Sequence, residues 1–283
     1  MHFISNFLIT LFAYLIDRKF GEFRFIKHPI IVIGEIISFF EEKFYKDSIF
    51  RGSLLVLFVL TIVGGLTYAI ELYLDFLPTW LNIIITSFFA SMFLAHNMLR
   101  ESVLAVLSTE DKREAISMLV SRDTADMSES DIHKACIETY AENLSDGVIA
   151  PLLYLLFFGL TGIVLYKAVN TMDSMVGYRN ENYERYGKVV AKLDDALNFI
   201  PSRITALLIM LLAKQRPLFN FYKDGSKHES PNAGHPITAM ALALRVKLGG
   251  DTSYFGKMKK KPYFGKGREH ITNKDVIRTV EIL

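Results

Sequence analysis

Two long stretches without a charged side chain constrain the fold of this 283-residue chain more than any other feature. Residues 54–70 and 76–99 contain no Asp, Glu, Lys or Arg. They are close to the roughly 20 residues that a helix needs to cross a bilayer. Inside the bilayer every backbone polar group must be bonded internally, which favours helices. The sequence therefore predicts an all-α, polytopic membrane protein.

Three further apolar segments raise the expected number of membrane segments to four or five. Residues 3–16 precede Asp17, Arg18 and Lys19 instead of a cleavage pattern, which indicates a retained anchor. Residues 199–213 form a last apolar segment.

The remaining segment, 148–169, contains Pro151, Gly159 and Gly162 and is expected to be broken or re-entrant. Broken helices are tolerated at membrane depth where protein encloses them. We favour a hairpin that turns at 159–162 over a simple crossing.

Charge sets the expected orientation. The loop 17–53 holds seven Lys and Arg, and the link 71–78 holds none. The positive-inside bias places 17–53 in the cytoplasm and 71–78 outside. The predicted location is the cell membrane, with the lipid bilayer as partner; a nucleic-acid partner is not expected, and formation of a homo-oligomer is left open.

The tail from residue 214 is basic, with 14 Lys and Arg against 6 Asp and Glu. It indicates contact with phosphates or anionic lipid, or simply a cytoplasmic segment. Helices are expected over 237–248 and 274–282, the second capped by Asn273. A lone cysteine, Cys136, excludes an internal disulfide and a multi-cysteine zinc site.

The predicted organisation is one membrane-embedded catalytic domain over 1–283. Within it, residues 1–99 form the anchor and two spans, 100–213 carry the catalytic helices with the broken segment, and 214–283 form the basic tail.

Acidic side chains gather next to the broken segment. Glu138, Glu142 and Asp146 are spaced i, i+4, i+8, so a helix would stack them on one face. Like charges at that spacing repel, and a divalent metal or an arginine would compensate them. A solvated acidic face is the alternative.

Two more acidic groups lie on the far side of the broken segment. Asn170 and Asp173 follow Lys167, and Asp194 and Asp195 are adjacent. Magnesium binds one or two carboxylates together with phosphate oxygens of a substrate. The arginine candidates for phosphate or carboxylate recognition are Arg122, Arg179 and Arg203.

Several long strings resemble one family, the adenosylcobinamide-phosphate synthases or CobD/CbiB proteins of cobalamin biosynthesis. The strings are SRDTADM (121–127), ETYAENLSDGVIAPLLY (138–154), YKAVNTMDSMVGYRNENYERYG (166–187), KLDDALNFIPSRITALLI (192–209) and SPNAGHPITAMALAL (230–244). The resemblance runs from about residue 14 to the end. Many relatives carry Trp and Glu where this chain has His235 and Ile237.

The resemblance implies a multi-pass membrane ligase. It would join adenosylcobyric acid to (R)-1-amino-2-propanol O-2-phosphate, or to free aminopropanol, with ATP and Mg²⁺ as cofactors. Phosphorylation of the carboxylate would activate it for attack by the amine, and such transfer needs positioning and charge neutralisation.

The residues of this sequence are assigned to that reaction by chemical type. The predicted magnesium ligands are Glu142, Asp146, Asp173, Asp194 and Asp195. The predicted catalytic groups are Glu142, Asp146 and Asp173. The predicted groups for phosphate and substrate are Arg122, Asp123, Asn143, Lys167, Asn170, Arg179, Arg203 and Asn232.

Two other functions remain open at this point. A corrinoid-binding transporter would use the broken segment. A magnesium-dependent intramembrane phospho- or prenyl transferase would also gather aspartates around phosphates, but the Asp-x-x-x-Asp spacing it needs is missing from this sequence.

Overall fold

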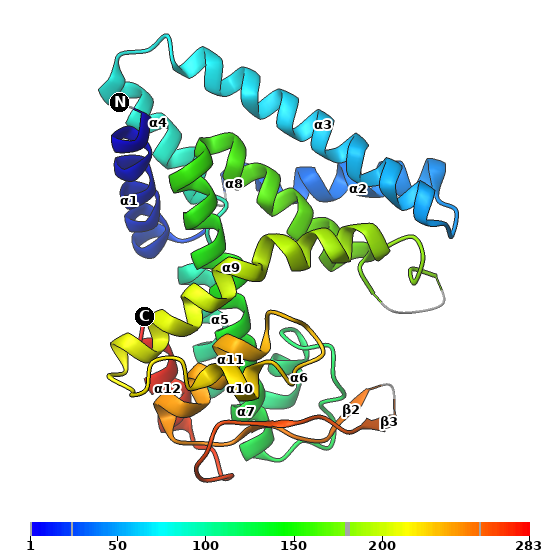
Figure 1. The fold of residues 1–283 in the computed structure, drawn as a ribbon, viewed down its shortest axis with the longest axis vertical. Helices are drawn as coiled ribbons and strands as arrows, with labels where there is room; N and C mark the ends of the chain where they lie inside the picture. Colours follow the sequence, from blue (N-terminus) through cyan, green and yellow to red (C-terminus); the bar gives the residue numbers. More distant parts are fainter. Residues whose placement is uncertain (1, 24, 179–181, 255) are drawn as a thin grey trace. The chain divides into compact units, whose positions relative to one another are not determined.

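The regular secondary structure of the described residues is almost entirely helical, as the sequence predicts (Figure 1). The structure, a computed structural model, describes residues 2–23, 25–178, 182–254 and 256–283. It separates into two compact units, each built from two stretches of chain: 1–97 with 150–197, and 98–149 with 198–283. The predicted single catalytic domain stays a prediction.

Within the described residues the elements are mostly helices, with short strands near the end of the chain. The helices of the first unit are α1 (His2–Phe20), α2 (Pro29–Phe44), α3 (Ile49–Leu74), α4 (Thr79–Ser91) and α8 (Ala150–Val176). Helices α5 (His96–Ser108) and α9 (Lys188–Leu212) continue from the first unit into the second. The second unit has α6 (Lys112–Ser117), α7 (Glu129–Leu144), the π-helix η1 (Ser145–Ile149), α10 (Phe221–Gly225), α11 (Gly234–Leu244), β1 (Leu248–Gly249), β2 (Thr252–Tyr254), β3 (Lys257–Lys259), β4 (Tyr263–Phe264) and α12 (Asn273–Glu281).

Four helical stretches of the described chain are long and apolar enough to cross a membrane. They are Ile49–Leu74, Thr79–Ser108, Glu129–Val176 and Lys188–Leu212. The predicted span 54–70 and the broken segment 148–169 lie within this set, and the predicted span 76–99 overlaps Thr79–Ser108, where residues 92–95 separate α4 from α5. The expectation of a polytopic helical membrane protein is confirmed.

The first unit packs α8 against α1, α2, α3 and α4. Its core is mainly aliphatic and includes Ile37, Leu55, Val59, Ile163 and Met172. Helix α2 is not among the segments predicted above. It begins at Pro29, whose fixed φ suits the first helical position, and the His28 side chain accepts the Ile30 N–H as a cap.

Helix α8 is broken at Gly159, as the sequence predicts. Gly159 has φ 68° and ψ −161°, a conformation that is open essentially only to glycine. Figure 1 shows the two arms of α8 meeting at an angle. The second arm continues to Val176, well past the expected end of the segment at residue 169.

The chain after α8 returns to the link between α2 and α3. The Tyr45 hydroxyl donates to the Asn182 carbonyl at 2.7 Å, and the Tyr183 hydroxyl donates to Glu41 Oε1 at 2.6 Å. Gly52 allows the Tyr186 carbonyl to approach so closely that an added Cβ would lie 1.9 Å from it. This return agrees with the hairpin interpretation.

In the second unit, α7 packs against α11 and α12. The basic tail contains two small antiparallel sheets that the sequence did not predict, in which β1 pairs with β4 and β2 with β3. Helix α12 is capped by Thr272, which forms a capping box with Asp275, so the predicted Asn273 cap is wrong. Asn273 is instead the first helical residue.

Candidate functional site

In the first unit, side chains from two helices meet in one polar group. Lys167, Asn170 and Asp173 recur every three residues along α8, which keeps them near one face of that helix. Lys167 Nζ donates to Asn170 Oδ1 at 3.0 Å, and Asn170 Nδ2 donates to Asp194 Oδ1 on α9 at 3.4 Å. Asn170 and Asp194, which are 24 positions apart in the sequence, are therefore brought into contact.

The carboxylates of this group are close enough to interact. Asp194 and Asp195 both act electrostatically on Asp173. Asp194 is buried, and Asp173 and Asp195 are half-buried. Gly177 leaves room for the Asp173 carboxylate, because a Cβ there would lie 2.0 Å from Asp173 Oδ1. We call Lys167, Asn170, Asp173, Asp194 and Asp195 the α8–α9 group.

Neighbouring contacts fix the two helices of this group. The Tyr154 hydroxyl on the first arm of α8 donates to the Leu197 carbonyl of α9 at 3.0 Å. The Tyr154 ring stacks on Tyr166 of the second arm, with ring centroids 4.8 Å apart. The two arms of α8 and α9 are thus tied together beside Lys167.

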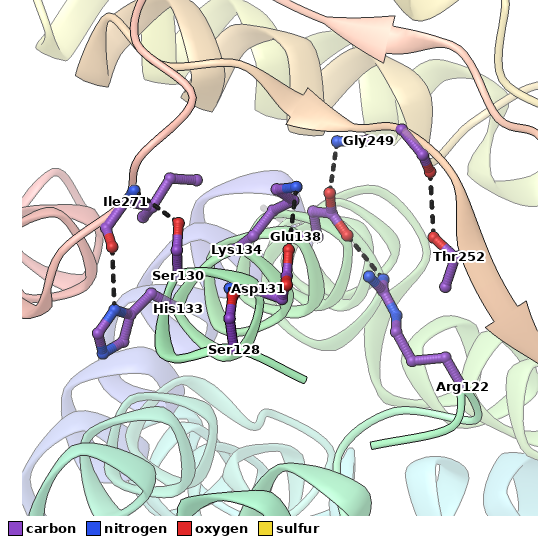
Figure 2. A network of polar contacts seen from close by, with 11 residues as sticks. Arg122, Ser128, Ser130, Asp131, His133, Lys134, Glu138, Gly249, Thr252 and Ile271 are labelled. Atoms are coloured by element: carbon purple, nitrogen blue, oxygen red, sulfur yellow. Dashed lines mark hydrogen bonds and ion pairs between the residues drawn. The ribbon is translucent and has the colours of Figure 1, made fainter. Parts of the chain in front are cut away.

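In the second unit, Arg122 forms a largely buried ion pair with Glu138 (Figure 2). Arg122 Nη2 donates to Glu138 Oε2 at 2.6 Å, and the other oxygen of Glu138 accepts the Gly249 N–H at 2.6 Å. The compensation that the acidic face of α7 was expected to need is therefore supplied to Glu138 by an arginine.

The charges around Arg122 stabilise its protonated form. Burial alone would lower the pKa of Arg122, but the charge and the hydrogen bond of Glu138 raise it above its usual value. Tyr254 and Glu142 contribute in the same direction. Glu142 thus lies within electrostatic range of Arg122.

Asp123 binds the β2–β3 hairpin. Its backbone N–H donates to the Ser253 carbonyl at 3.0 Å. Its Oδ2 accepts the Ser253 hydroxyl and the Gly256 N–H, the latter at 2.8 Å. This carboxylate therefore attaches the 122–124 loop to the basic tail.

The strict stacking predicted for Glu138, Glu142 and Asp146 ends before Asp146. A π-turn begins at Ser145 and interrupts the 3.6-residue repeat. Asp146 lies in that turn, and single π-turns are frequent at functional sites. The neighbouring Ser145 hydroxyl is buried and has no hydrogen-bond partner among the described atoms. Asn143 is exposed and donates to Thr139 O on its own helix at 2.9 Å.

Arg203 and Asn232 are also brought together. Arg203 Nη1 donates to Asn232 Oδ1 at 2.9 Å, and Nη2 donates to the Pro231 carbonyl at 2.9 Å. The guanidinium lies 3.7 Å from the centroid of the Phe199 ring. These contacts attach the 230–236 loop to α9, and the predicted role of both residues in substrate binding stays a prediction.

The predicted ligand set divides between the two units. Asp173, Asp194 and Asp195 belong to the first unit, and Glu142 and Asp146 belong to the second. Arg179 lies outside the described residues. Among the residues described, no group of three or more His, Cys, Asp or Glu is arranged to hold a metal ion by itself. That these residues share one pocket stays a prediction.

The sequence did not single out two groups near Arg122. His228 is largely buried, and its pKa is lowered mainly by burial, with Lys261 acting in the same direction. Lys261 binds the Tyr254 hydroxyl and lies over that ring. Both residues come from basic loops without a helical repeat, so their spacing in the sequence did not indicate that they would lie near Arg122.

His235 lies at the start of α11 and is buried. It is 1% exposed and stacks on Tyr222, with ring centroids 4.9 Å apart. Burial first, and then the charges of Arg203 and His228, lower its pKa to about 4. The helix start at Gly234 turns this ring into the interior of the unit.

Long apolar helices, a broken segment and polar groups at its ends define a polytopic helical membrane protein with a charged site. The chain belongs to the CobD/CbiB family, because the family model described as CobD/Cbib protein matches residues 10–283.

Similar curated proteins carry related names. "Probable cobalamin biosynthesis protein CobD" of Pyrococcus furiosus is 42% identical over 238 residues, covering 83% of this chain and 82% of that protein. "Cobalamin biosynthesis protein CobD" of Halalkalibacterium halodurans is 37% identical over 286 residues, covering 96% and 90%. "Probable cobalamin biosynthesis protein CobD" of Methanococcus aeolicus is 39% identical over 262 residues, covering 85% and 84%. No solved structure matches this chain significantly.

Proposed function

We propose that this chain is an ATP-dependent amide ligase of cobalamin biosynthesis in the cell membrane. It would join adenosylcobyric acid to (R)-1-amino-2-propanol O-2-phosphate. Membership of the CobD/CbiB family and the names of the relatives support the pathway. The residue chemistry of the polar groups supports the reaction type.

The proposed reaction has two steps. A carboxylate oxygen of the corrinoid attacks the terminal phosphorus of ATP, the bond to ADP breaks, and an acyl phosphate forms. The amine nitrogen then attacks the acyl carbon, phosphate leaves, and the nitrogen loses a proton to a carboxylate. Such phosphoryl transfer depends mainly on positioning and on neutralisation of charge.

The observation that carries the proposal is the α8–α9 group. An ammonium, an amide and a buried carboxylate form one hydrogen-bonded series there, from Lys167 through Asn170 to Asp194. Lys167 would contact phosphate oxygens, and Asn170 would keep both Lys167 and Asp194 in place. In the second unit, Arg122 and Asp123 would orient substrate, and Glu142 or Asp146 would accept the proton.

The donor chemistry of the α8–α9 group fits magnesium. The ion usually binds one or two protein carboxylates, with phosphate oxygens and water completing its shell, so it needs no all-protein cage. Asp173 and Asp194 would be its first ligands here, with Asp195 beside them. When bound, magnesium would neutralise negative charge on the phosphates.

The test uses the full chain in detergent with adenosylcobyric acid, aminopropanol phosphate, ATP and magnesium. Release of ADP only when both substrates are present is the expected result. The Asp173→Asn substitution removes the negative charge and should lower kcat by about 100-fold or more. Loss of a group that stabilises developing charge usually has an effect of this size. Glu35→Gln, an exposed carboxylate paired with Lys27, is the control and should keep the wild-type rate.

Two outcomes would contradict the proposal. ADP release that needs neither substrate would exclude the ligase reaction. Full activity of Asp173→Asn with unchanged magnesium dependence would remove Asp173 from the site.

A corrinoid transporter is the second candidate, because the break of α8 at Gly159 is a feature that transporters use around binding sites. It predicts corrinoid binding by the same preparation without formation of ADP or amide.

A further inference from the structure

The break in α8 leaves backbone groups that the helix itself cannot bond. The first N–H groups of the second arm and the last carbonyls of the first arm have lost their helical partners. Glu71 of α3 accepts from these N–H groups: Oε1 from Leu160 N at 3.1 Å, and Oε2 from Thr161 N at 3.3 Å. Glu71 Oε2 also accepts the Thr161 hydroxyl at 2.6 Å.

The opposite side of the break is bonded by α1. Asn6 Nδ2 donates to the Leu156 carbonyl, in the last turn of the first arm, at 3.3 Å. Two helices far from α8 in sequence thus supply an acceptor and a donor where the apolar segment interrupts its own hydrogen bonds. Backbone groups without a hydrogen bond are energetically costly in such a segment. The Asn6 and Glu71 side chains therefore stabilise the bend.

Glu71 suits its place electrostatically as well as geometrically. A carboxylate at a helix N-terminus interacts favourably with the helix dipole. The contact also requires Gly159, since an added Cβ there would lie 2.4 Å from Glu71 Oε1. Further along the same interface, Gly64 of α3 receives the Leu165 side chain.

We propose that Glu71 is a positioning residue for the second arm of α8, and the inference rests on the proposed function. This arm carries Lys167, Asn170 and Asp173. At about 1.5 Å per residue, they lie roughly 9 to 18 Å along the helix axis from Thr161. Glu71 fixes the start of the arm, and so sets its rotation and its height relative to α9. The Asn170–Asp194 bond, already 3.4 Å long, is the contact most sensitive to a shift of the arm.

The experiment compares Glu71→Ala and Glu71→Gln with Asp75→Asn in the full chain. Asp75 lies one turn further along and accepts only from Asn82 on the described contacts, so it is a matched control. Amide hydrogen exchange over 157–166 reports on the bend, and exchange over 79–91 reports on the rest of the unit. Kinetics of ADP release give kcat and KM separately.

In Glu71→Ala, the Leu160 and Thr161 amides should exchange faster while residues 79–91 stay protected. We expect kcat to fall about tenfold or more, with a smaller change in KM, because a misplacement near 1 Å can cost about 100-fold. Glu71→Gln keeps one acceptor oxygen and should be intermediate. Asp75→Asn should match the wild type in both measurements.

A second variant separates positioning from general stability. Glu71→Ala combined with Thr161→Asp returns a carboxylate to the first turn of the arm without the contact to α3. Recovery of protection from exchange at residues 160 and 161 without recovery of kcat supports the proposal. In that case the helix cap is restored, but the contact with α3 is not. Recovery of both would overturn it, because local capping alone would then suffice.

Two further results would overturn the proposal: unchanged exchange and kcat in Glu71→Ala, or equal loss of protection over 157–166 and 79–91. If the wild type releases no ADP with both substrates, the proposed ligase activity fails. The hydrogen-exchange rates at residues 160 and 161 then show, independently of activity, whether Glu71 fixes the start of the second arm.

Discussion

At the scale of single residues, the buried ion pair of Arg122 and Glu138 stabilises the second unit. Both side chains are largely buried, and Glu138 is bonded on both oxygens. Removing one partner of such a pair leaves an uncompensated buried charge, which typically costs about 3–5 kcal/mol.

Arg122→Ala is therefore expected to lower the free energy of unfolding by about 3 kcal/mol, measured by denaturant unfolding in detergent. Lys247→Ala is the control, because the Lys247–Glu269 pair is exposed and exposed pairs contribute little to stability. Equal effects of the two variants would mean that the Arg122 pair is not desolvated in solution.

His235 gives a pH dependence whose sign follows from its burial. The folded state prefers the neutral ring, with a pKa of about 4, whereas the unfolded value is 6.5. The contribution to stability is complete above pH 6.5 and is lost as the pH falls toward 4.

We expect His235→Phe to remove this component. The stability of the wild type should fall relative to that of His235→Phe by roughly 2–3 kcal/mol between pH 7 and 4, measured by unfolding at a series of pH values. A constant difference between the two proteins over that range would show that the ring is not held neutral.

At the scale of elements, the bend of α8 depends on a glycine. Gly159→Ala would place a Cβ against Glu71 in a backbone conformation that other residues rarely adopt. The expected loss is about 2–3 kcal/mol of unfolding free energy.

Gly65→Ala in α3 is the matched control for this prediction. Its added Cβ meets nothing within 4 Å, and its helical backbone accepts alanine. It should be neutral or stabilising by about 0.5–1 kcal/mol. Thermal unfolding of both variants tests the pair, and a tolerated Gly159→Ala would argue against the bend.

Helices could be predicted from the sequence where a long run of uncharged, apolar residues forms them. The other elements were harder to predict. The uncharged run at 54–70 predicted α3 and the glycines predicted the break in α8, whereas the run at 76–99 is divided between α4 and α5. Helix α2 was missed because its start depends on one local contact, the His28 cap before Pro29. The two small sheets were missed because strands of two or three residues carry no period.

The candidate site was predictable in its composition and only partly in its geometry. The three-residue spacing of Lys167, Asn170 and Asp173 placed them on one side of a helix, and α9 brought Asp194 to them. The spacing of residues in the sequence could not show that Glu138 would form an ion pair with Arg122. It also could not show that the π-helix η1 would interrupt the acidic face of α7. Both depend on packing between distant segments.

At the scale of the whole molecule, the first unit predicts a definite topology. The segment after α8 contacts the loop between α2 and α3, so both should lie on one side of the membrane. The surplus of Lys and Arg over 17–53 makes that side the cytoplasm.

Side-specific reporters at Lys46, Phe76 and Glu184 test this arrangement. The reporters at Lys46 and Glu184 should both read cytoplasmic, and the one at Phe76 should read external. An external Glu184 would mean that α8 crosses the bilayer despite its bend.

The Glu71 contact has a consequence for biogenesis. The ribosome makes residue 71 long before residues 160 and 161, and at about 5–20 residues per second the delay is roughly 4–18 s. During that interval a newly inserted α3 carries a carboxylate whose final hydrogen-bond donors, at Leu160 and Thr161, do not yet exist. The nascent helix must keep this end at the headgroups or beside the insertion machinery until the later segment emerges. A stalled ribosome between these points should therefore trap an intermediate in which α3 sits shallowly and remains open to aqueous labelling.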